Sequence, residues 1–308
     1  MYGHQVIEDL SVLMNKDRKN STLYHQLIKS ISKSTHFYIG EASSMSSILG
    51  NKMSGKEIFK DELSELIRLP YKYCWFDYDL PPNEDKETES TKRGILTSEL
   101  LPNVIACNIF MFTNYYKHWI DPFGYFVIII GDTADNIRKK YKILDEMFSK
   151  AKDKSTVNGK SNIFFNLYNE YSGKFTLDEI LISYGRDLDI LNEILLLLSC
   201  KNITTEVHEA PVKLNKARAK KGKGPLFTYH TLKLMPLNQK TKTKTKPGEP
   251  TGEHYRLHLC RGHFKRFTEE KQLFGKLTGL YWWQPHLRGQ DHTGFVDKDY
   301  EISLVGKG

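Results

Sequence analysis

A wide apolar stripe along residues 176–200, "TLDEILISYGRDLDILNEILLLLSC", limits the possible folds more than any other feature of the chain. Leucine, isoleucine and tyrosine recur there every three or four residues, which is the period of an α-helix. Thr176 and Glu179 form a capping-box pattern that predicts where this helix begins. Because so wide a stripe is unstable in water, another layer of structure has to cover it.

The segments before this helix predict that the covering layer is a β-sheet. Aromatic or apolar runs typical of strands occur at residues 73–80, 94–100, 103–113 and 124–132. Several of the connections are too short for helical crossovers, so the sheet should be mainly antiparallel. We therefore predict an α+β fold, with N-terminal helices and this sheet in a scaffold domain over residues 1–204. A basic, β-rich module should follow over residues 205–308, with a flexible loop at 238–253, where the sequence is low in complexity.

The composition indicates a globular protein of the cytoplasm. The most apolar runs, "YFVIII" and "ILLLL", are too short to span a bilayer. The first twenty residues contain no apolar stretch of signal-peptide length. Cys74, Cys107, Cys200 and Cys260 are widely spaced without a CxxC pair, which is typical of reduced and mostly buried thiols.

Positive charge is concentrated in the last third of the chain. The net charge is +8, but residues 209–308 hold 20 basic against 9 acidic side chains, whereas residues 1–208 are close to neutral. Such an asymmetry is typical of a basic module that faces a polyanion.

Arginine, lysine, histidine and aromatic residues alternate in the same region, as in "HYRLHLCRGHFKRF" and "GLYWWQPHLRG". Basic groups neutralise phosphates, and ring faces stack on unpaired bases, so the pattern suits RNA or another single strand better than a duplex groove. We expect these side chains to share one surface, although Trp282 and Trp283 should point opposite ways because side chains alternate along a strand. The predicted nucleic-acid-binding residues are Lys213, Lys216, Arg218, Lys220, Lys221, Lys223, Arg256, His258, Arg261, His263, Lys265, Arg266, Trp282 and Arg288.

Two alternatives place chemistry in the same sequence. The first is a metal-assisted nuclease or phosphoesterase that uses His263, or Asp77 and Asp79, since acidic residues near strand ends can hold Mg²⁺. The other is a zinc site in the run from His254 to His263, but its spacing matches no common zinc finger, so we expect no metal. The chain has neither a GxxxxGK[ST] loop nor a GxGxxG motif, so no cofactor is expected.

The C-terminal run "RLHLCRGHFKRF…GLYWWQPHLRG" resembles the signature of a phage- and plasmid-borne family that includes an anti-CRISPR protein directed at the type V-A effector nuclease. "LPYKYCWFDYD" and "EILLLLSCKNI" are more loosely similar to segments of that family. Arg261, Gly262, His263 and Phe264 match the motif, whereas Cys260 stands where an arginine is usual. The resemblance implies a mobile-element protein of the bacterial cytoplasm that counters a host defence.

Together these patterns predict a non-enzymatic protein that binds RNA or single-stranded nucleic acid through its basic module. Besides the hydrolase, one further alternative stays open. In it the basic face binds only protein, such as a host factor or a ribosome-associated target. No membrane partner is expected.

Overall fold

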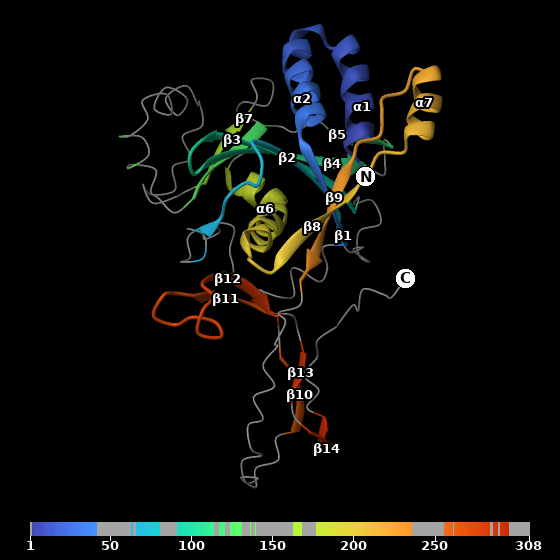
Figure 1. Cartoon of the computed structure of the whole chain (residues 1–308). Coiled ribbons are helices and arrows are strands. Elements are labelled where there is room, and N and C mark those ends of the chain that lie inside the picture. Colours follow the sequence, from blue (N-terminus) through green and yellow to red (C-terminus); the bar gives the residue numbers. More distant parts are fainter. Residues whose placement is uncertain are drawn as a thin grey trace.

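The computed structural model describes residues 2–41, 63, 66–80, 91–113, 117–120, 124–130, 136, 139, 163–167, 177–235, 256–260, 262–283, 286–288 and 290–295. Its centre is a nine-stranded mixed sheet in the order β7-β6-β4-β3-β2-β1-β9-β8, with β5 paired to β4 (Figure 1). The strands are β1 Thr35–Glu41, β2 Tyr73–Asp79, β3 Lys92–Leu101, β4 Val104–Thr113, β5 His118–Ile120, β6 Gly124–Ile129, β7 Ile163–Leu167, β8 Ile203–His208 and β9 Tyr229–Leu234.

The pairing is antiparallel except around β1. β1 runs parallel to both β2 and β9, while every other strand pair of this sheet is antiparallel. The α+β class and the mainly antiparallel sheet are therefore confirmed. β4 is apolar on both faces, as its sequence predicts, because it lies in the middle of the sheet with a helical layer on each side.

A helical hairpin covers one face of the sheet. It consists of α1 Gly3–Lys16 and α2 Ser21–Lys33, joined by the short 3-10 helix Arg18–Asn20. The side chain of Asp17 accepts hydrogen bonds from the backbone of Lys19 and Asn20 and so fixes the turn. The apolar stripes of both helices pack on strand residues that include Trp75, Leu96 and Phe110. This hairpin is what buries one face of β2.

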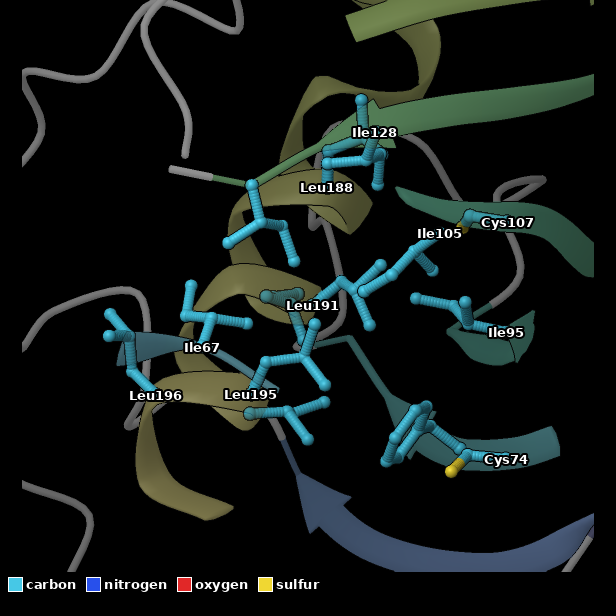
Figure 2. Close-up of a cluster of buried hydrophobic side chains, with 14 of the residues drawn as sticks. Ile67, Cys74, Ile95, Ile105, Cys107, Ile128, Leu188, Leu191, Leu195 and Leu196 are labelled. Carbon is cyan, nitrogen blue, oxygen red and sulfur yellow. The ribbon is translucent and has the colours of Figure 1, made fainter. Parts of the chain in front are cut away.

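Helix α6, Leu177–Ser199, covers the other face. Figure 2 shows its leucines Leu188, Leu191 and Leu195 pointing at strand residues such as Ile95, Ile105 and Cys107. These leucines recur at i, i+3 and i+7, which is the helical spacing that the sequence predicts. Cys74, Cys107 and Cys200 are buried free thiols, as expected.

The last described residues form two small sheets below α6 in Figure 1. Their strands are β10 Arg256–Cys260, β11 His263–Phe267, β12 Gly279–Trp283, β13 His286–Arg288 and β14 Gln290–Phe295. The boundary expected between residues 204 and 205 falls inside β8, and β9 pairs with β1, so the central sheet continues across it. The expected flexible loop at 238–253 lies outside the described residues.

Candidate nucleic-acid interface

The basic segment after β8 is a helix, α7 Val212–Lys220, that buries none of its residues. Residues turn by about 100° each along a helix, so Lys213, Lys216 and Lys220 lie on one side of α7. All of them are exposed. We call this side the lysine face of α7. Lys221 and Lys223 follow directly and are also exposed.

Polar contacts hold the opposite side of α7 in place. Arg218 bonds to Glu8 of α1 at 2.7 Å and donates to the carbonyl of Gly224 at 2.7 Å. Asn215 exchanges two hydrogen bonds with the backbone of Leu226, of 2.8 and 3.0 Å. Because the helix contributes no apolar surface to the core, these bonds are what orient the lysine face toward solvent. Arg218, which the sequence places among the phosphate contacts, is thus directed at Glu8 and Gly224 and away from the lysine face.

A second group of predicted residues lies on the antiparallel pair β11–β12. His263, Phe267, Tyr281 and Trp283 share its outer face, with ring centroids 5.7–6.3 Å apart. The ammonium of Lys265 lies over the rings of Phe267 and Trp283, at 5.1 and 5.9 Å. We call these four rings the hairpin ring cluster. The rings of His263, Phe267 and Trp283 are exposed or partly exposed beside this cation, which suits a stacked base, whereas Tyr281 is only 5% exposed.

The inner face of the same pair belongs to the core. Trp282 is 7% exposed and packs against Phe264 and the α6 cluster. Asn202 fixes this position by bonding both the N–H and the C=O of Trp282, at 2.9 and 2.8 Å. Trp282 and Trp283 thus point opposite ways, as predicted. The ring of Trp282, expected among the nucleic-acid-binding residues, thus packs in the core, whereas that of Trp283 lies on the outer face.

The structure does not gather the predicted residues on one surface. Figure 1 shows α7 beside α1 near the top of the view and β11–β12 below α6, on its far side. The separation arises because β8 and β9 join the edge of the central sheet and carry α7 with them. Arg266 lies exposed on β11.

The remaining predicted residues belong to the small sheet or lie outside the described part of the chain. Along the backbone, His258 of β10 pairs with Arg288 of β13, and Arg256 pairs with Gln290 of β14. Arg261 lies outside the described residues.

Asp77 and Asp79 lie on the face of β2 that α1 and α2 cover. Asp77 is fully buried and accepts a hydrogen bond from the indole of Trp75 at 2.6 Å. Burial raises the pKa of Asp77 to about 7, although the bond from Trp75 opposes the rise. Asp79 accepts from the Tyr2 hydroxyl at 2.7 and 2.8 Å. Both carboxylates are engaged in holding the start of α1 to the sheet.

This geometry does not assemble the hydrolase alternative. Within the described residues, no three His, Cys, Asp or Glu side chains come together to hold a metal ion. His263 lies on β11, whose inner face packs on the α6 side of the sheet, whereas Asp77 and Asp79 face α1 on the other side. The structure therefore brings no predicted catalytic carboxylate near His263.

A buried polar group that sequence reasoning missed lies between the sheet and α6. Asp187 of α6 accepts a hydrogen bond from Tyr78 and lies 3.5 Å from the guanidinium of Arg93. Burial raises the pKa of Asp187, while Arg93 and the bond from Tyr78 lower it. Its side chains are all buried or nearly so, and they tie α6 to β2 and β3 of the sheet.

A scan against protein-family models matched no family, and searches of curated proteins and of solved structures found no match. Among the helices in the described residues, none is both long and apolar enough to cross a membrane.

Proposed function

We propose that this protein binds single-stranded nucleic acid, RNA or DNA, without cleaving it, and that the lysine face of α7 holds the phosphates. The observation that carries the proposal is a helix that buries nothing and yet is fixed by polar bonds on the side opposite its lysines. A helix with no apolar face gains little from packing. The polar bonds that fix α7 are explained if the protein requires its lysines in a defined position.

The charge and ring content of the chain support the same ligand class. The excess of basic residues after residue 208 favours a polyanion, and lysines at i, i+3 and i+7 repel one another until phosphates neutralise them. The hairpin ring cluster supplies a separate place where bases can stack. A duplex offers no unpaired base to such rings, so a single strand fits better.

The resemblance of the C-terminal run to a phage- and plasmid-borne family suggests the biological context of this binding. We propose a phage or prophage accessory protein that acts in the bacterial cytoplasm and counters a host defence. The resemblance is what supports this part, and it rests on the motif residues Arg261, Gly262, His263 and Phe264.

Fluorescence anisotropy with labelled single-stranded RNA and DNA tests the binding. We expect binding that weakens with salt. A triple variant with glutamine at Lys213, Lys216 and Lys220 should lower the slope of the logarithm of the binding constant against the logarithm of the salt concentration by about 2, at about 0.7 per phosphate contact on single strands. The same change at Lys16, Lys29 and Lys33, which are exposed on α1 and α2, alters net charge equally and is the control.

Two results would contradict the proposal. One is the absence of salt-sensitive binding at low ionic strength. The other is an equal loss in both triple variants, which would show that overall charge and not the lysine face determines affinity. Cleavage of the RNA in the presence of Mg²⁺, Mn²⁺ or Zn²⁺ that is lost in His263→Ala would favour the hydrolase instead.

A further inference from the structure

A pocket opens at the foot of α7, where the chain leaves β8 and returns to β9. Its volume is about 640 Å³, which lies within the range of about 300–1,000 Å³ typical of small-ligand sites. The walls come from the start of α1, from β8 and from the segment that returns to β9, and they include His4, His208, Glu209, Phe227 and Tyr229. None of these residues is among those that the sequence predicts for binding.

Two ring stacks form the walls of this pocket. His208 and Tyr229 lie face to face, with centroids 4.7 Å apart and planes 16° apart. Phe227 stacks on the buried ring of His36 at 4.1 Å and 13°. A hydrogen bond of 2.9 Å between His208 and Thr231 fixes the first stack. The rings are held in place by neighbours, so a flat ligand meets surfaces that need little ordering.

The polar groups of the pocket are few. Glu209 is held by the hydroxyl of Thr228 at 3.2 Å, and that hydroxyl in turn accepts from the backbone of Ala210. Burial, together with nearby Arg218, lowers the pKa of His4, so its ring is neutral near pH 7 and has one donor and one acceptor. A carboxylate offers acceptors only, so Glu209 selects a ligand edge that carries donors.

We infer that this pocket takes one unpaired guanine of a single strand, stacked against the rings and bonded through its Watson–Crick edge to Glu209. Guanine presents neighbouring N1–H and N2–H donors on that edge, which match the two oxygens of a carboxylate. Adenine and cytosine place an acceptor nitrogen beside their amino group, and uracil has a single donor between two carbonyls. The inference rests on the proposed function and specifies which base of the bound strand the protein recognises.

The surroundings favour a strand over a free nucleotide. Pro211 lines the pocket, and α7 begins at the next residue, so the lysine face starts beside the pocket and leads away from it. Its lysines extend over more than one helical turn, which exceeds what the phosphate of one nucleotide can contact. Neighbouring nucleotides of a strand supply the other phosphates.

Anisotropy with labelled oligouridine strands of about ten nucleotides that carry one internal guanine, adenine, cytosine or uracil tests the inference. We expect the guanine strand to bind about tenfold more tightly than the others. Glu209→Gln should abolish that ranking. Glu206→Gln, on the same strand region but outside the pocket and paired with Lys233, removes the same charge and should keep it.

Two further experiments test the contribution of ring stacking and distinguish a strand from a free nucleotide as the source of the base. Tyr229→Ala should weaken binding of every strand by about tenfold, whereas Tyr229→Phe keeps the ring and should bind as the unaltered protein does. Guanosine monophosphate should displace the guanine strand only at concentrations well above those at which the unlabelled strand does so. Equal potency of the two competitors would overturn the assignment to a strand.

The outcomes separate a failure of strand binding from a failure of the pocket assignment. If no strand binds, the proposed function fails and the pocket assignment fails with it. If all four strands bind with the same salt-sensitive affinity, or if the guanine strand binds more tightly but Glu209→Gln keeps that preference, the pocket assignment alone is refuted.

Discussion

Replacing Asp77 by asparagine should change how the stability of the protein depends on pH. Asp77 is fully buried, and its pKa rises from 3.8 to about 7 because burial disfavours the charged form. Below the lower value the folded and unfolded chains both hold the proton. Between the two values only the folded chain holds it, so the free energy of unfolding falls as the pH rises and levels off above 7.

The magnitude follows from the two pKa values. Each pH unit between them changes the free energy of unfolding by about 1.4 kcal/mol. From pH 5 to pH 8 the native protein should therefore lose about 3 kcal/mol that Asp77→Asn does not lose. Asparagine keeps an oxygen for the indole of Trp75, so the variant remains folded.

Urea denaturation, followed by circular dichroism at pH 5 and pH 8, measures the free energy of unfolding of Asp77→Asn and of the native protein. The titration of all other groups cancels in the difference between the two free energies. Leu96→Val, on the same face of the sheet, should cost about 1 kcal/mol at both pH values and is the control. If the difference between Asp77→Asn and the native protein is the same at both pH values, Asp77 is ionised in the folded state and the burial argument is wrong.

Two stability predictions follow from close packing and from the buried ion pair. Gly94→Ala should cost about 1–3 kcal/mol because its Cβ would overlap the ring of Trp75. Gly185→Ala, in open space on α6, should instead gain up to about 1 kcal/mol. Thermal unfolding that shows the same sign for both variants would contradict this. Arg93→Met should cost about 3–5 kcal/mol by leaving Asp187 without its cation, and adding Asp187→Asn should recover at least half of the loss in urea denaturation. A double variant as unstable as Arg93→Met alone would show that the guanidinium acts through packing and not through charge.

The parts of the fold that the sequence predicts are those decided locally. The leucines of α6 recur with the period of a helix, and β4 is a continuous apolar run of strand length; the structure confirms both elements. The position of β1 between β2 and β9 has no local signal, because parallel partners lie far away in the chain. Asp77 shows the same limit, since its burial depends on a helical hairpin that begins more than sixty residues earlier.

The candidate site shows which signals were open to sequence reasoning. The charge of the sequence predicts a basic segment at α7. It does not distinguish the anchors Asn215 and Arg218 from the lysines beside them, because their partners Leu226 and Glu8 are identified only in three dimensions. Alternation along a strand did predict that Trp282 and Trp283 face opposite ways. Which of them faces the core depends on Asn202 and on the end of α6, and no pattern near residue 282 shows it.

The pairing of β8 with β9 explains why one excess of positive charge becomes two surfaces. β9 joins β1 and β8 joins β9, so the connection that contains α7 is fixed beside the start of α1. The chain then leaves the sheet, and Asn202 holds β12 against the far end of α6. Net charge counts both surfaces together and cannot separate them. The pocket beside α7 has its own stacked rings, so exposed lysines and ring faces lie together there independently of the hairpin ring cluster.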